Sequence, residues 1–236
     1  MKCGCKVSGN HTVSELPNQL RPRFLSGLKA ADLAAILSLA RHRYFSASSV
    51  AIYQRDPAER LYMLTSGHGR HFVDTSEGRK VSLNWITPGQ IFGGAAMVAT
   101  PTDYLASTEL LTGSCALVWN RQTIRSLISR HSVLLENVFS IVVTEHLAWM
   151  VATQVSLAND DARKRIAQLL LSLISAIGKA GPEGIELQVR NEDLATGADV
   201  TPFTASRVLG EWQRAGVLTK RRGSLVMRKP ELLLAS

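Results

Sequence analysis

The sequence has few cysteines, no apolar segment at its N-terminus and no long uninterrupted apolar run. Only three of its 236 residues are cysteine, and this odd number argues against a secreted domain built on paired disulfides. The first ten residues, MKCGCKVSGN, lack the apolar core of a secretory signal. The longest apolar stretch, Ile166 to Ile177, has twelve residues and is interrupted by Gln168 and two serines, far short of a membrane-spanning helix. The sequence therefore predicts a cytoplasmic protein with no membrane partner.

Acidic residues are also in the minority. Lys and Arg number 27 against 19 Asp and Glu, so the net charge is +8 and the isoelectric point is near 9.8. This excess favours an anionic partner, either nucleic acid or a membrane surface. With 45% hydrophobic and 19% charged residues, the chain is globular and suits one large domain or two medium ones.

Residues 188 to 229 have the pattern of two short helices joined by a tight turn and followed by a hairpin. We expect a first helix over Asn191 to Ala198, with Asn191 as its N-cap. A second helix is expected over Pro202 to Ala215, because Thr201 can cap it and Gly216 can stop it. Two short strands then enclose a basic turn. This arrangement predicts a winged helix-turn-helix, a domain that binds duplex DNA.

The second helix of such a domain enters the major groove with its N-terminal half. Arg207 lies in that half, and its planar fork can bond both O6 and N7 of one guanine; the alternative is a simple phosphate contact. Residues 201 to 236 carry seven Lys or Arg and two Glu, so much of the net charge lies here. Arg228 and Lys229 are further candidate phosphate ligands. The predicted DNA-binding residues are Arg190, Thr201, Pro202, Phe203, Thr204, Ser206, Arg207, Lys220, Arg221 and Arg222.

The pattern between Tyr44 and Trp119 consists of short apolar or alternating runs separated by turn residues. Many short strands with regular Gly and Pro predict a β-roll or jelly-roll barrel, preceded by short helices from Arg23 to Arg41. The predicted fold class is therefore α+β. The expected segments are a flexible tail (1–20), an effector-sensing β-roll domain (21–130), a long dimerisation helix (131–158) and a winged helix-turn-helix domain (159–236).

Helical periodicity resumes at Arg121 and continues to about Leu157, with a coiled-coil-like apolar seam. A helix so long carries more apolar surface than one compact barrel can cover, so packing against a second copy is expected. Duplex recognition by this motif also calls for two copies. The alternative is an intramolecular core helix packed on the barrel. The predicted seam residues are Leu134, Val138, Ile141, Glu145, Ala148, Ala152 and Val155.

The hinge after this helix is expected at Asn159 and Asp160, which would also cap the next helix, Asp161 to Ile177. Lys179 to Gly184 is interpreted as a linker. A strand is expected from Ile185 to Val189.

Barrel, long helix, hinge and winged helix-turn-helix in this order resemble the Crp/Fnr family of bacterial transcription regulators, over roughly Phe24 to Leu233. The opening strands of the family's barrel resemble YFSASSVAIYQRDPAERLYMLTSGHGRHFV, and its Pro-Gly-x-x-Phe-Gly segment resembles ITPGQIFGG. The recognition helix and wing resemble VTPFTASRVLGEWQRAGVL. The resemblance implies a homodimeric transcription regulator, not an enzyme, that binds double-stranded DNA, senses an unknown small effector and contacts RNA polymerase. It does not specify a cofactor, a target sequence, or activation against repression.

Departures from the family pattern argue against cyclic AMP as the effector. Members that bind it place a Glu and, about ten residues later, an Arg where this chain has Gly94 and Tyr104. A buried phosphate without a cation costs several kcal/mol. The family's Thr-Ser pair on the long helix aligns with Met150 and Val151. The candidate lining of an apolar effector pocket is Phe92, Gly93, Gly94, Tyr104, Trp149 and Met150, although ordinary core packing explains such residues equally well.

Two further branches of the family carry metal cofactors. An oxygen-labile iron–sulfur cluster needs four cysteines, and Cys3, Cys5 and Cys115 are one short. Alternatives are a disordered tail or a redox pair for the first two, and a small core residue for Cys115. A haem branch would use histidines such as His68 and His71, for which a solvated loop is the simpler interpretation. No catalytic or metal site is predicted.

The recognition helix departs from the family as well. Many members begin it with Arg or Ser followed by Glu, where this chain has Pro202 and Phe203, while Arg207 matches the family's groove-facing Arg. We expect a DNA site that keeps a guanine contact, with Phe203 against a thymine methyl. Competing hypotheses are a constitutive DNA-binding regulator with a degenerate barrel, and a cupin-type metalloenzyme. The His-x-His pattern of the latter is missing from the barrel.

Overall fold

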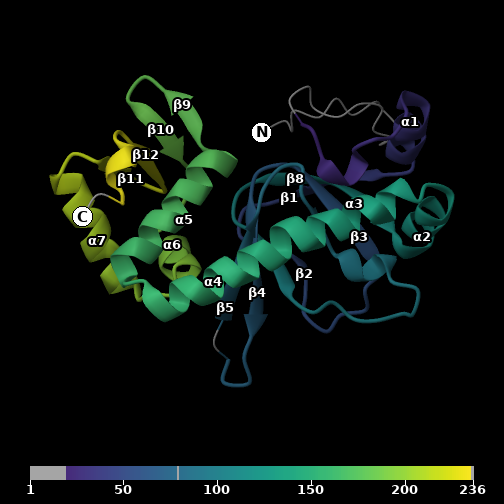
Figure 1. The fold of residues 1–236 in the computed structure, drawn as a ribbon, viewed down its shortest axis with the longest axis horizontal. Coiled ribbons are helices and arrows are strands. Elements are labelled where there is room, and N and C mark those ends of the chain that lie inside the picture. The colour runs from purple at the N-terminus through teal and green to yellow at the C-terminus, as the bar shows by residue number, and fades with distance from the viewer. Residues whose placement is uncertain (1–19, 79, 235–236) are drawn as a thin grey trace. The chain divides into compact units, whose positions relative to one another are not determined.

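The computed structural model describes residues 20–78 and 80–234. The chain divides into two compact units, Met1–Ala148 and Trp149–Ser236 (Figure 1). Among the described residues, the first unit contains two four-stranded antiparallel sheets, and the second contains a four-stranded sheet together with helices. The predicted α+β class is confirmed, with a barrel-like N-terminal domain, a long helix and a C-terminal helix-turn-helix.

The strands of the first unit pair in the orders β1-β8-β3-β6 and β2-β7-β4-β5. Turns at Gly67 and Gly89 adopt positive φ angles of 80° and 93°, which glycine tolerates without strain. Strands β4 and β5 form a hairpin that projects beyond the other strands (Figure 1). The bounds are β1 (Arg41–Phe45), β2 (Ser49–Ile52), β3 (Arg60–Ser66), β4 (Gly69–Asp74), β5 (Lys80–Ile86), β6 (Ile91–Phe92), β7 (Ser107–Leu110) and β8 (Ser114–Asn120).

Strand β3 is buried on both faces, which explains its continuous apolar sequence. Because side chains alternate along a strand, Leu61 and Met63 face one core while Tyr62 and Leu64 face another. The first core lies under the short helices η1 (Arg23–Leu25), α1 (Ala30–Ser38) and α2 (Arg121–Arg130). Trp119 belongs to it, and its indole N–H donates to the Ile36 carbonyl at 3.0 Å. The second core fills the interior of the barrel.

The long helix consists of α3 (Val133–Ile141), the π-helical segment η3 (Val142–Leu147) and α4 (Ala148–Asn159). Leu134 and Ile141 are buried in the first core, and Val138 packs against it. The prediction that these residues form a dimer seam is therefore wrong. The exposed apolar side chains of this helix are Leu135, Phe139, Val142, Val143, Leu147, Met150, Val151, Val155 and Leu157.

The stretch Val133–Asn159 is also long and apolar enough to cross a membrane, by length and composition alone, with a mean hydropathy of 1.4. The sequence prediction missed this because it searched for an unbroken apolar run. Scattered polar residues interrupt the apolar run of Val133–Asn159 but lower its mean hydropathy only a little. The exposed apolar surface of this helix needs a partner, whether protein or lipid.

After α4, the second unit continues with α5 (Ala162–Ile177). Its N-cap is Asp161, whose carboxylate accepts from the Lys164 N–H at 2.8 Å, so the predicted caps Asn159 and Asp160 are wrong. Asp160 instead forms an ion pair with Lys164 at 3.1 Å. Its carboxyl pKa is lowered by hydrogen bonds from Lys164 and Ser156. The cap thus lies one residue later than expected.

The predicted linker Lys179 to Gly184 is wrong, because it forms a hairpin. Strand β9 (Lys179–Gly181) pairs with β10 (Gly184–Leu187), which replaces the longer strand expected to reach Val189. The sheet order is β11-β12-β10-β9, with β11 (Leu218–Arg221) and β12 (Ser224–Met227) as the wing.

The two helices of the DNA-binding motif are α6 (Asn191–Gly197) and α7 (Pro202–Arg214). Asn191 is the first helical residue and Arg190 occupies the cap position without a capping side-chain bond, so the predicted Asn191 cap is wrong. The Thr201 cap is confirmed, since its hydroxyl accepts from the Thr204 N–H at 3.1 Å. The motif's second helix therefore starts where the sequence indicates.

The hydrogen bonds of the Tyr104 hydroxyl are expected to stabilise the barrel interior. This hydroxyl donates to the Arg60 carbonyl at 2.8 Å and accepts from the Arg60 N–H at 2.9 Å. We expect Tyr104→Phe to lower the free energy of unfolding by about 1–3 kcal/mol, because two backbone groups lose their partner. Tyr53→Phe, at a tyrosine that is 58% exposed, should change it little. Urea unfolding measures both, and equal stabilities of the two variants would contradict the assignment.

Candidate nucleic-acid interface

Helix α7 has one buried and one exposed face. Ala205, Val208, Leu209 and Trp212 are buried under it. The opposite face exposes Phe203, at 79%, together with Ser206 and Arg207. A helix anchored by such a stripe presents its other residues rigidly, which is what insertion into a major groove requires.

Arg207 is held by its own helix. Its Nη1 donates to Glu211 Oε1 at 2.8 Å, and Arg163 Nη1 donates to the other oxygen, Oε2, at 3.1 Å. The Arg163 guanidinium also lies over the Trp212 ring, 4.9 Å from its centroid. The sequence analysis missed Arg163 and Glu211. The four-residue spacing of Arg207 and Glu211 is a signal that could have found the latter.

The wing brings basic side chains close to α7. Lys220 Nζ donates to the Ser206 carbonyl at 3.2 Å, so this predicted phosphate ligand touches the recognition helix. Arg221 and Arg228 both pair with Glu183, at 2.6 and 3.4 Å, and Arg222 is exposed at the tip of the β11–β12 turn. Glu183, in the β9–β10 turn, is a further residue that the sequence analysis missed.

The remaining predicted DNA contacts lie at the starts of the two helices. Pro202 is the first residue of α7, and the Thr204 hydroxyl lies 2.9 Å from that of Thr201. Arg190, at the cap of α6, forms a two-pronged ion pair with Asp193, at 2.9 and 3.2 Å. Arg190 is thus bonded to its own helix.

The barrel interior is filled at the predicted effector position. Phe92 stacks on Tyr62 with centroids 4.8 Å apart, and Tyr104 is buried in the same core. Burial raises the pKa of Tyr104 to about 12, so the hydroxyl stays protonated. Gly93 has a φ of 77°, and a Cβ there would lie 2.6 Å from the Arg60 carbonyl oxygen. Ordinary core packing therefore explains Phe92 and Tyr104.

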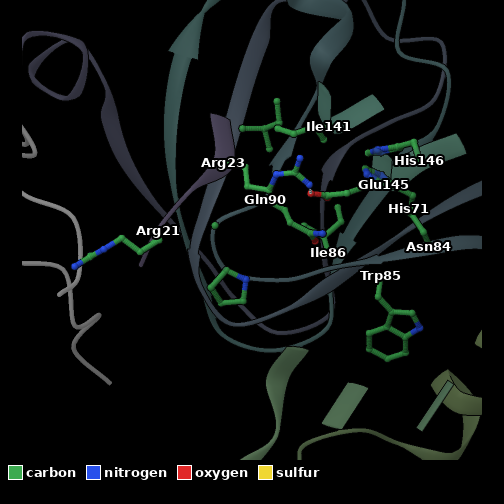
Figure 2. A pocket seen from close by; sticks show the side chains of 13 residues that line it. Arg21, Arg23, His71, Asn84, Trp85, Ile86, Gln90, Ile141, Glu145 and His146 are labelled. Carbon is green, nitrogen blue, oxygen red and sulfur yellow. Dashed lines mark hydrogen bonds and ion pairs between the residues drawn. The ribbon is translucent and has the colours of Figure 1, made fainter. Parts of the chain in front are cut away.

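The other predicted effector residues lie elsewhere. Gly94 starts the short helix η2 (Gly94–Met97), while Trp149 and Met150 belong to the second compact unit. None of the six predicted effector residues lines the cavity shown in Figure 2.

A cavity of about 180 Å³ lies at another place in the first unit (Figure 2). It is lined from β4, β5, the β5–β6 turn and the long helix. Figure 2 shows Arg23 directed at Glu145, with His71 and His146 beside this pair. Arg23 also donates to the hydroxyls of Ser140 and Thr144, at 3.2 and 3.1 Å. Glu145, predicted as a seam residue, is thus an ion-pair partner within its own domain.

The predicted solvated histidine loop is wrong, since His68 is buried and His71 is partly buried. The His68 ring lies 5.8 Å from that of Trp85, and His71 Nδ1 is 3.0 Å from the Thr108 hydroxyl. Burial, together with the smaller effect of the nearby His146, lowers the pKa of His71 from 6.5 to about 4. Among residues 20–78 and 80–234, no three His, Cys, Asp or Glu side chains are grouped to hold a metal.

Cys115 is buried on β8, as expected for a small core residue, and it is disulfide-bonded. Cys3 and Cys5 lie outside the described residues.

These features define a two-domain regulator, with a β-roll domain, a long helix and a winged helix-turn-helix. The family comparison agrees: residues 42–131 match the cyclic nucleotide-binding domain, and residues 164–236 match the Crp-like helix-turn-helix domain. The chain belongs to the Crp/Fnr family of transcription regulators. Crp-like helix-turn-helix regulators bind double-stranded DNA, and the family consists of regulators rather than enzymes.

Relatives with known roles align over most of the chain. The Cyclic AMP receptor protein of Thermus thermophilus is 26% identical over 207 residues, which cover 88% of this chain and 93% of that protein. The Anaerobic regulatory protein of Bacillus subtilis is 23% identical over 213 residues, covering 88% and 89%. The structure of FixK2 from Bradyrhizobium japonicum shares the fold at 19% identity, with a TM-score of 0.71 and coverage of 82% and 95%.

The lowered pKa of His71 predicts a loss of stability in acid. Above pH 6.5 the side chain is neutral in both states, whereas between pH 6.5 and about 4 only the unfolded chain binds the proton. The free energy of unfolding should fall by roughly 2–3 kcal/mol through this window. We expect His71→Gln to lose less stability than the parent between pH 7 and 4.5. Urea unfolding at each pH measures this, and equal losses would refute it.

Proposed function

We propose that this chain is a homodimeric regulator that binds a specific DNA sequence through the exposed face of α7. The observation that carries the proposal is the juxtaposition of Arg207 and Phe203 on that face, opposite the buried stripe. Arg207 is 57% exposed and can offer two donors to one guanine. Lys220 and Arg222 lie on the adjoining wing, where they would contact phosphates.

Phe203 indicates which base is expected next to the guanine in the DNA half-site. A phenyl ring offers no hydrogen bond to a base edge, but it can pack on the methyl group of thymine. Phe203 is 79% exposed at the start of the recognition helix, where it is available for such a contact. We infer a half-site in which a thymine neighbours the guanine.

The exposed apolar face of the long helix favours a second copy as its partner. Leu135, Phe139, Val142, Met150 and Val155 recur at spacings of three, four, five and eight residues along it. A lipid bilayer is a less favourable partner for this helix. Glu145 and its ion pair with Arg23 lie near the middle of Val133–Asn159, and charged groups in the centre of a bilayer cost free energy. A dimer also supplies the two recognition helices that a two-fold DNA site needs.

The filled barrel argues against cyclic AMP as the effector of this chain. The relative from Thermus thermophilus is named for that ligand, and a structure that is 20% identical is described as c-di-GMP responsive. Here Gly94 and Tyr104 supply no charge for a phosphate, and Tyr104 closes the core. Constitutive DNA binding fits this filled interior. The cavity beside Glu145 is the alternative site for an unidentified effector, and RNA polymerase is the proposed partner in transcription.

Selection of DNA by the purified protein tests the proposed function. We expect enrichment of one sequence with a guanine in each half-site. Arg207→Lys should reduce discrimination at that guanine by about 5- to 100-fold, because an ammonium cannot bond two acceptors in the plane of the base. Arg222→Ala should instead weaken binding to all sequences and reduce the salt slope by about one. No enrichment with the parent protein would refute the proposal.

Introducing a charge among the exposed apolar side chains of the long helix tests the proposed dimer. We expect Phe139→Glu to convert the dimer to a monomer, because two carboxylates would be buried at a symmetric interface. Leu105→Glu is the matched control, since Leu105 is 85% exposed on the barrel and should leave the dimer intact. Light scattering after size-exclusion chromatography measures the mass. A monomeric parent that is soluble without detergent would exclude both the dimer and the lipid alternative.

A further inference from the structure

Glu211 occupies an unusual place for an acidic side chain, on the helix that faces DNA. It lies one turn after Arg207 and is 34% exposed at its side chain. A carboxylate near the phosphate backbone lowers affinity by repulsion, and the remaining predicted contacts on this face are neutral or basic. Its presence therefore calls for a compensating function.

The two carboxylate oxygens are divided between two arginines. Oε1 accepts from Arg207 Nη1 at 2.8 Å, and Oε2 accepts from Arg163 Nη1 at 3.1 Å. Arg163 is itself fixed, because its guanidinium lies on the ring of Trp212, which is fully buried. Arg163 therefore fixes the Glu211 carboxylate, and this carboxylate in turn fixes Arg207.

The bond to Glu211 uses one end of the Arg207 fork. The edge formed by Nε and Nη2 has no hydrogen-bond partner among the described residues, and this edge carries two parallel donors. Two parallel donors match O6 and N7 of guanine. Fixing a long side chain in advance reduces the loss of conformational entropy that binding would otherwise cost.

We propose that Glu211 is a positioning residue that orients Arg207 toward guanine, and that Arg163 supports it from the first turn of α5. The inference rests on the proposed guanine contact of Arg207. Glu211 lowers affinity for DNA in general and raises selectivity for the guanine-containing sequence.

Glu211→Gln separates this role from others, because it keeps the size of the side chain and removes the charge. We expect its discrimination between the selected duplex and one with guanine replaced by adenine to fall by about 3- to 20-fold. Its affinity for an unrelated duplex should rise, with a steeper salt dependence. Glu231→Gln removes the same charge from the same unit, outside α7, and should leave discrimination unchanged. Fluorescence anisotropy at several salt concentrations measures both quantities.

The opposite outcomes overturn the inference in recognisable ways. Equal gains for both duplexes would make Glu211 a simple electrostatic restraint. Equal losses with a lower melting temperature would make it a structural residue. In an Arg207→Ala background, Glu211→Gln should no longer alter discrimination, and a persisting effect would assign it to another residue. If Arg207→Ala itself leaves discrimination intact, the proposed guanine contact fails instead, independently of Glu211.

Discussion

The long helix carries more apolar surface than the core of its own domain buries. The organisation of the molecule depends on where this surface is buried. One face, with Leu134 and Ile141, completes the core beneath Trp119, and that core also covers the outer side of β3. Other apolar side chains of the helix, such as Phe139 and Val155, are exposed in the part of the chain that the structure describes. Hydrophobic burial is the main favourable term in folding, so such a surface drives association. This surface is the basis of the proposed dimer.

The barrel illustrates how a family fold can be retained while its interior changes. Strand β3 contributes Tyr62 to the inner core, and this ring stacks on Phe92. Tyr104 closes the same core through two bonds to one backbone residue. Because protein interiors are close-packed, these rings and a buried ligand cannot occupy the same space. A cavity lies instead beside the ion pair of Arg23 and Glu145.

The sequence predicted the features that depend on local chemistry. Thr201 and Pro202 mark the start of α7 because a cap and an N1 proline act within one turn, and the short runs between turns indicate the barrel. Features that depend on tertiary packing were missed. Periodicity cannot tell which apolar face of a helix meets a core, so Leu134 was placed in a dimer seam. The hairpin partner of β10 was assigned to a linker because three residues of Lys179–Gly181 carry little strand signal.

The same limit applies to charge. A count of basic residues locates the DNA-binding face, but it does not show which cations are already paired. Arg221 shares Glu183 with Arg228, and Arg207 shares Glu211 with Arg163. Exposed pairs of this kind contribute little to stability, so a stability role explains them poorly. Their effect lies in orientation: each acidic side chain fixes the direction of an arginine whose reach would otherwise be wide. Selectivity for a sequence then arises from the few acidic residues of a basic domain as much as from its many cations.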